Sequence, residues 1–303
     1  MTVTGKPAES RAADGEPCPD EPVIEVLASR ETEVGGIPVR RALPKRTRRL
    51  VGAWCFADHF GPADVEAGMR VGPHPHMGLQ TVTWLLDGEV VHRDSLGSEQ
   101  LIRPGQLNLM TAGLGIAHAE VSTRASSRLH GAQLWIAQPE RTRNEAPAFE
   151  HHPDLPSATA GTFDVTVIAG EMLGAVSTAR TDTPLVGVDI TGHPGTGEFP
   201  LRPDFEYGII TLVGEFDVEG TPALPGSLVY LGRGRDHLGL RCTERSRGLL
   251  LGGEPLGENV LMWWNFVART RAEVDAARAD WNASGTRFGE VRSELRRIAA
   301  PAN

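Results

Sequence analysis

Residues 81–88 read TVTWLLDG, and this short stretch indicates the fold of the chain. Its β-branched and aromatic residues are typical of a strand, and Asp87-Gly88 is a strong signal for a tight hairpin turn. Similar short apolar runs extend from residue 71 to residue 137, with turn signals roughly 8–12 residues apart. This pattern predicts an antiparallel β-barrel or sandwich, because parallel βαβ units would need helices between the strands.

The second half of the chain repeats this pattern in a weaker form. The first half has a strand-like run at 78–88, then Pro104-Gly105 and then His118. The second half has a similar run at 208–214, then Pro225-Gly226 and then His237. We therefore expect a degenerate duplication, with further strands in the second half at 163–169, 185–190, 215–218, 227–231 and 248–251.

These patterns predict an all-β protein with an antiparallel barrel or sandwich in each half and a C-terminal amphipathic helix. The helix is expected within 265–283, where Val267, Val274 and Trp281 recur at helical spacing. We predict four segments. Residues 1–21 form a disordered tail, and residues 22–140 form an N-terminal metal-binding domain. Residues 141–160 form a linker rich in Pro and charge, and residues 161–303 form a degenerate C-terminal domain that carries the helix.

Composition and charge limit the possible partners. The 303 residues carry a formal net charge of -9, which disfavours direct binding to nucleic acid. The one basic cluster, at 40–49, is more typical of a solvated loop or edge strand than of a phosphate site. Three cysteines without a Cys-x-x-Cys pair, no secretory signal and no long apolar run together predict a cytoplasmic protein that does not contact a membrane. We also expect a monomer.

Two motifs carry candidate metal ligands. Residues 73–78 read PHPHMG and supply His74 and His76, and residues 115–120 read GIAHAE and supply His118 and Glu120. Because residues i and i+2 of a strand point to the same face, each pair would aim at one spot. Three imidazoles and one carboxylate suit Fe(II), Mn(II), Ni(II), Cu(II) or Zn(II), and a six-coordinate ion would keep two positions open.

Other polar residues are weaker candidates. His92, Asp94 and Glu89 follow the hairpin and are expected to make turn hydrogen bonds. Gln80 lies four residues after His76, so in a regular strand it would share the histidines' face and orient a ligand. The remaining candidates are isolated in sequence and are expected to be ordinary buried or solvated histidines: His59, His130 and His237.

At these motifs the sequence resembles the pirin family of the cupin superfamily. The resemblance runs from about residue 23 to residue 282 and is most specific at FADHFGP (56–62), HPHMG (74–78), MTAGLGIAHAE (110–120) and GEPL (253–256). It implies a bicupin of two stacked antiparallel β-barrel (jelly-roll) domains, in which only the N-terminal barrel binds metal. The family's ligands fall on His74, His76, His118 and Glu120, and iron is the usual metal.

The resemblance also implies two kinds of function. Some pirins resemble quercetin 2,3-dioxygenases, in which a flavonol chelates the metal, and Glu120 would then be both ligand and proton acceptor. Other pirins are described as non-enzymatic regulators that respond to metal or redox state and bind protein partners. Many pirins read HPHRGFE, whereas this chain has Met77, Leu79 and Gln80 at the variable places, so we expect an altered pocket wall.

Overall fold

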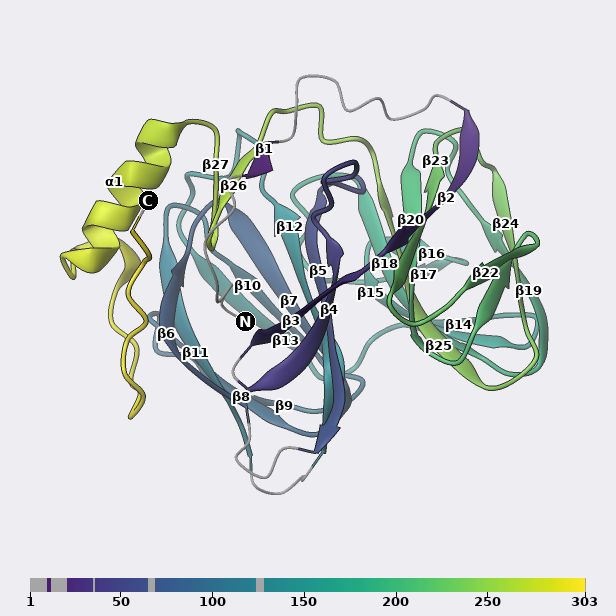
Figure 1. Ribbon diagram of the computed structural model, residues 1–303, viewed down its shortest axis with the longest axis horizontal. Helices are drawn as coiled ribbons and strands as arrows, with labels where there is room; N and C mark the ends of the chain where they lie inside the picture. Colours follow the sequence, from purple (N-terminus) through teal and green to yellow (C-terminus); the bar gives the residue numbers. More distant parts are fainter. Residues whose placement is uncertain (1–9, 12–20, 35, 65–68, 124–127, 303) are drawn as a thin grey trace.

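Two antiparallel β-barrels lie side by side, and one α-helix covers the outer side of the first barrel (Figure 1). The computed structural model describes residues 10–11, 21–34, 36–64, 69–123 and 128–302. The predicted fold class is confirmed: strands dominate, neighbouring strands pair antiparallel, and the one α-helix is C-terminal.

The first barrel consists of a large and a small sheet. The large sheet has seven strands in the order β13 (Ala148–His152), β10 (Leu107–Thr111), β7 (Leu79–Asp87), β12 (Arg128–Ala137), β5 (Trp54–Asp64), β4 (Ile37–Leu43) and β3 (Arg30–Val34). The small sheet has four strands in the order β6 (Arg70–His76), β11 (Ile116–Ser122), β8 (Val90–Asp94) and β9 (Glu99–Ile102). The predicted strand at 81–86 is the core of β7, at the centre of the large sheet.

The second barrel repeats this plan. Its large sheet has the order β14 (Ser157–Ala160), β15 (Phe163–Ala169), β18 (Leu185–Gly192), β25 (Ser246–Gly253), β20 (Glu206–Val213), β23 (Ser227–Gly232) and β2 (Pro22–Ala28). Its small sheet has the order β19 (Gly195–Pro200), β24 (His237–Cys242), β21 (Phe216–Val218) and β22 (Thr221–Ala223). A two-stranded hairpin, β16 (Glu171–Met172) with β17 (Ala175–Val176), lies beside them. Apolar side chains such as Phe163, Phe199 and Phe216 fill this barrel.

Strand pairing divides the chain differently from the predicted boundaries. Strand β2 comes from the segment assigned to the N-terminal domain, yet it pairs with β23 of the second barrel. The segment 141–160, predicted as a linker, contains β13 and β14, and each of these strands extends a different barrel. Of the predicted disordered tail, only residues 10, 11 and 21 are described. Strand β1 (Ser10–Arg11) pairs with β26 (Leu261–Trp263).

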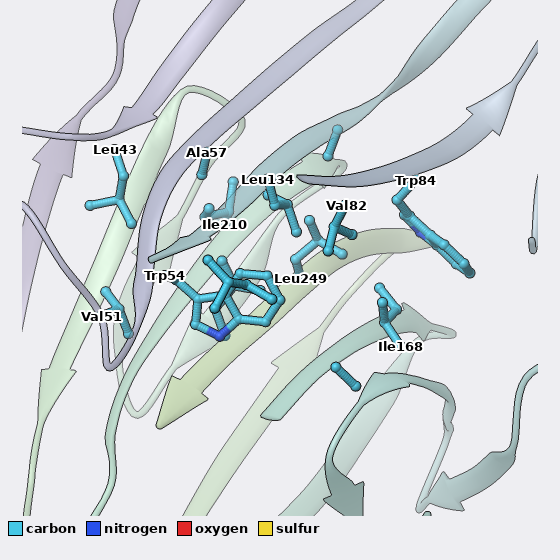
Figure 2. Close-up of a cluster of buried hydrophobic side chains, with 14 of the residues drawn as sticks. Leu43, Val51, Trp54, Ala57, Val82, Trp84, Leu134, Ile168, Ile210 and Leu249 are labelled. Carbon is cyan, nitrogen blue, oxygen red and sulfur yellow. The ribbon is translucent and has the colours of Figure 1, made fainter. Parts of the chain in front are cut away.

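The two barrels are joined by an apolar core between their large sheets (Figure 2). Trp54 of β5 lies in this core beside Leu134 of the first barrel and Leu249 of the second. Its indole N–H contacts the carbonyl oxygens of Val186 and Gly252 at 3.1 and 3.2 Å, both in the second barrel. The contact between barrels is therefore both apolar and hydrogen-bonded.

The C-terminal segment packs on the first barrel, although it follows the second barrel in sequence. It contains β26, β27 (Phe266–Ala268), α1 (Arg271–Asn282) and a 3₁₀ helix (Thr286–Phe288). The helix is shorter than predicted, because β27 occupies the start of the expected range and Thr270 caps the helix by accepting a hydrogen bond from Glu273 N–H. The helix lies beside β6 and β11 (Figure 1). Trp281 and Phe288 share an apolar cluster with Ala117 of β11 and with Met77, which follows β6.

In the described part of the chain, no helix is both long enough and apolar enough to cross a membrane.

Substitution of Trp54 by alanine should destabilise the protein strongly. The residue is fully buried between the barrels, so the change leaves a large cavity and removes two hydrogen bonds. Large-to-small changes of this kind cost about 3–5 kcal/mol. The free energy of unfolding from urea denaturation measures this loss. Leu114→Ala is the control, because Leu114 is 47% exposed and should change stability by less than about 0.5 kcal/mol. An equal effect of the two variants would contradict this role of Trp54.

Candidate metal centre

The two predicted ligand motifs lie on neighbouring strands of the small sheet of the first barrel. In the register of β6 and β11, His118 is opposite His74, but Glu120 is opposite Val71. Two residues of β6, Gly72 and Pro73, therefore lie opposite one residue of β11, Ala119, which defines a β-bulge. Without the bulge, Val71 and His74 would point to opposite faces of the sheet. With it, both point into the barrel.

Three imidazole rings converge inside the barrel. The Nε2 atoms of His76 and His118 are 3.1 Å apart, and the rings of His74 and His118 have centroids 4.4 Å apart. All three side chains are completely buried, and each offers a nitrogen within 4.8 Å of the other two. The structure thus brings together the three predicted histidines. The pair of Glu120 with His118 forms a second, overlapping group with His92.

The hydrogen bonds of His74 leave one nitrogen available for a metal. His74 Nδ1 lies 2.8 Å from the carbonyl oxygen of Gly72, and a carbonyl can only accept, so Nδ1 carries the proton. His74 Nε2 is then unprotonated. This atom is buried and has no hydrogen-bond partner among the described residues. A buried lone pair without a partner is costly, and a metal ion would satisfy it.

His92 is a functional residue that the sequence prediction did not select. It lies on β8 opposite Glu120, and its Nδ1 is 3.2 Å from His118 Nδ1. Its Nε2 is 3.2 Å from Asp94 Oδ2. Burial alone would raise the pKa of Asp94, but its hydrogen bonds with His92 and Ser98 lower it, so its carboxylate accepts.

This arrangement fixes the tautomer of His118. The Nε2–H of His92 donates to Asp94, so in neutral His92 the Nδ1 atom accepts a hydrogen bond from His118 Nδ1–H. His118 Nε2 is then left unprotonated and faces His76 Nε2. The signal in the sequence was the alternation of His92 and Asp94 along one strand, which places both side chains inside the barrel.

Burial keeps the imidazoles neutral. Desolvation lowers the pKa of His74 to about 3. The pKa values of His76 and His118 also lie well below 6.5, first because of burial and then because a positive charge on a neighbouring histidine would repel a second one. Metal ligation needs neutral imidazole, so these residues need not lose protons at neutral pH to bind an ion.

Glu120 lies inside the barrel, on the same strand as His118. Its carboxylate oxygen Oε1 accepts a hydrogen bond from Thr83 Oγ1 at 3.2 Å, and Gln133 Oε1 lies 3.1 Å from the same hydroxyl. Glu120 is 1% exposed. Glu120 lies with His118 and His92 in one group, whereas His74 and His76 lie with His118 in the other. A buried carboxylate beside neutral imidazoles supplies negative charge for a divalent ion, and the chemistry of these donors fits such an ion.

Opposite the histidines, the large sheet carries a polar row across its inner face. The row follows the register from β4 to β13, and its side chains point into the barrel: Arg41, Asp58, Gln133, Thr83, Asn108 and His151. Arg41 forms a two-pronged ion pair with Asp58 at 2.7 and 2.6 Å. The next row is aromatic. Phe56 stacks on Trp135, and the ring centroids of Trp135 and His76 are 5.2 Å apart.

The predicted role of Gln80 in orienting a ligand is wrong. Gly78 has a positive φ of 70° and separates β6 from β7, so the regular strand assumed for Gln80 is broken there. The Gln80 amide donates to Thr111 Oγ1 at 3.0 Å and so points away from the histidines. Met77 also faces outward, onto the C-terminal segment, whereas Leu79 packs with Phe56 and Trp135 beside the cavity.

The other histidines named as weak candidates lie elsewhere. His59 and His130 contact each other through their Nε2 atoms at 2.8 Å, and His237 is exposed on the second barrel. Where the first barrel has its histidines, the small sheet of the second has buried Phe199, Leu238 and Leu240. Within the described residues, both groups of side chains with metal-ligand geometry belong to the first barrel.

We expect His118→Ala to lose bound metal. Elemental analysis of protein purified without added metal should give close to one ion per wild-type chain and much less for the variant, because His118 belongs to both overlapping groups. His237→Ala is the matched control and should keep the wild-type content. Full stoichiometry in His118→Ala would contradict the assignment.

His92→Ala should weaken metal binding without abolishing it. Loss of a partner that orients a metal-ligating histidine typically lowers affinity by about 10–100-fold. A competition titration against a chromophoric chelator measures this change. Asp94→Asn should act in the same direction because the amide cannot fix the tautomer of His92 as a carboxylate does. Wild-type affinity in both variants would show that the His118–His92–Asp94 chain does not support the site.

Comparison with known proteins identifies relatives along most of the chain. The family model for pirin matches residues 36–136, and the model for the pirin C-terminal cupin domain matches residues 187–289. A Pseudomonas aeruginosa protein named "Putative quercetin 2,3-dioxygenase" is 47% identical over 291 residues, covering 94% of this chain and 92% of that protein.

Solved structures agree with this. The crystal structure of a quercetin 2,3-dioxygenase from Acinetobacter baumannii has a TM-score of 0.90 and 45% identity, covering 92% of this chain and 95% of that one. A bacterial pirin from Escherichia coli, solved in complex with nickel(II), shares the fold with a TM-score of 0.62 and 19% identity, covering 77% of this chain and all of that one. The bicupin architecture is therefore confirmed, and the chain belongs to the pirin family.

Proposed function

We propose that this chain is a metal-dependent oxygenase that resembles quercetin 2,3-dioxygenase and acts on a chelating enol or flavonol. One observation carries the proposal: three buried imidazoles converge inside the first barrel, His118 also belongs to an overlapping group with Glu120 and His92, and His74 Nε2 is buried with no partner among the described residues. The names of the Pseudomonas and Acinetobacter relatives support the same reaction class.

In this proposal His74, His76, His118 and Glu120 hold one divalent ion. Imidazole and carboxylate donors without thiolate suit Fe(II), which we favour, and also Ni(II), Mn(II), Cu(II) or Zn(II). A bound ion of this kind stabilises the anion of a hydroxyl group that coordinates it and so lowers the pKa of that hydroxyl. A flavonol presents such a hydroxyl next to a carbonyl, and the two oxygens can chelate one ion.

Glu120 is the proposed proton acceptor. It is the carboxylate of the donor set, and Thr83 holds its Oε1 atom in place. A carboxylate at hydrogen-bond distance from the substrate hydroxyl can take up the proton that the hydroxyl releases. The substrate is then an electron-rich anion, which can react with O2 and undergo ring opening with loss of carbon monoxide.

The walls of the barrel suit a flat aromatic substrate with several oxygens. Phe56 and Trp135 present stacked rings on one side, with centroids 4.0 Å apart, and Phe149 stacks on His92 on another. Between them, Asn108 Nδ2 and Trp135 Nε1 are buried donors without a partner among the described residues. These two N–H groups could bind hydroxyl or carbonyl oxygens of the substrate, while the aromatic rings exclude water.

The test is incubation of the metal-loaded protein with quercetin in the presence and absence of O2. We expect O2-dependent loss of the flavonol absorption band in the wild type. In Glu120→Gln, loss of the acceptor should reduce the rate by roughly 10²-fold or more. His237→Ala, on the second barrel, is the control and should keep the wild-type rate. No O2-dependent change with iron, nickel, copper or manganese would exclude quercetinase activity.

A further inference from the structure

A second pocket lies on the outer face of the small sheet of the first barrel. Its volume is about 430 Å³, within the range of small-molecule sites. It lies where the C-terminal segment crosses β6, β11 and β8. The lining residues are Arg70, Arg93, Val121, Arg292, Ser293, Glu294 and Leu295.

Strand register directs two arginines to this pocket. Arg70 on β6 is opposite Val121 on β11, and Arg93 on β8 is opposite Ala119. The two arginines therefore flank β11 diagonally, with Cα atoms about 12 Å apart by standard strand spacing. Two extended arginine side chains can span this distance and reach one anion. Arg292 approaches from the C-terminal segment and completes a three-sided site.

The positive charge of the pocket is only partly neutralised. Among the described residues, Arg70 and Arg292 form no ion pair, and Arg93 pairs only with Glu99, at 3.0 Å across an exposed contact. Glu294 is the one carboxylate in the lining. The lining thus carries three positive charges and one negative charge, on a chain whose formal net charge is -9. Clustering like charges without partners is unfavourable unless a ligand of opposite charge binds.

We propose that the pocket between Arg70, Arg93 and Arg292 binds the phosphate group of a small molecule. Guanidinium groups match the oxygens of phosphate with two parallel hydrogen bonds, and a phosphate dianion balances the net charge of the lining. The size of the pocket suits a phosphate monoester with a small body. A nucleic acid backbone does not fit the proposal, because the chain has net negative charge outside this site.

This site is separate from the metal cavity. Arg93 lies between His92 and Asp94 in sequence, but alternation along β8 turns its side chain to the opposite face of the sheet. The same holds for Val121, which follows Glu120 on β11. Phosphate binding can therefore be tested independently of the proposed oxygenase activity, with metal content as the control for an intact first barrel.

The experiment is calorimetric titration of the purified protein with inorganic phosphate and, separately, with glucose 6-phosphate. We expect saturable binding that weakens as sodium chloride is added. Arg70→Ala and Arg292→Ala should each weaken binding by about tenfold or more, because each removes a charge-assisted contact. Glu294→Gln should strengthen binding about two- to threefold, because it removes a like charge.

Two controls make the test decisive. Arg241→Ala removes an exposed arginine of the second barrel and should leave phosphate binding unchanged. Elemental analysis should show unchanged metal content in all four variants, which excludes phosphate bound to the metal. Wild-type affinity in Arg70→Ala and Arg292→Ala would overturn the proposal, as would the lack of saturable binding in the wild type. Binding only to phosphatidylcholine vesicles that contain phosphatidic acid would also overturn it, by assigning the site to a lipid headgroup.

Discussion

The pairing of β6 with β11 is the constraint on which the candidate metal site depends. The bulge at Gly72 and Pro73 shifts the register, so His74 and His76 face the same interior as Glu120. Its carbonyl groups also make two further contacts. Gly72 O fixes the tautomer of His74, and Pro73 O accepts a hydrogen bond from Ile298 N–H at 2.8 Å. One local irregularity thus orients a ligand and anchors the C-terminal segment.

The C-terminal segment in turn requires the glycines of this region. A Cβ atom on Gly72 would lie 2.2 Å from the carbonyl oxygen of Arg296, and one on Gly115 would lie 2.9 Å from the ring of Phe288. Both glycines let the segment approach the sheet closely, so that Trp281 and Phe288 can cover its outer face. The part of this face around Ala117 is thereby shielded from water.

The sequence was sufficient to predict the barrels and the convergence of the three histidines, because strand alternation determines which side chains share a face. It did not predict the partner of His118, since the contact with His92 depends on which strands are neighbours. The predicted role of Gln80 was wrong for a related reason, because the prediction assumed a continuous strand through Gly78. The pairing of β2 with the second barrel could not be predicted from local sequence, because an edge strand has the same residue pattern whichever sheet it joins.

The two barrels share one architecture but differ in the side chains of their interiors. The large sheet of the first barrel, taken from β13 to β3, and that of the second barrel, taken from β2 to β14, have equivalent strands in the same order. The predicted duplication therefore matches the fold strand by strand, including the Pro-Gly corners before β10 and β23.

Yet the interior of the second barrel is filled with phenylalanine and leucine, whereas that of the first keeps buried polar groups. Buried polar groups reduce the stability of a protein unless they form hydrogen bonds. Packing against a well-packed second barrel therefore helps to stabilise the first barrel. The apolar contact around Trp54 provides that neighbour, and it does so on the face of β5 opposite to Phe56 and Asp58, which line the cavity.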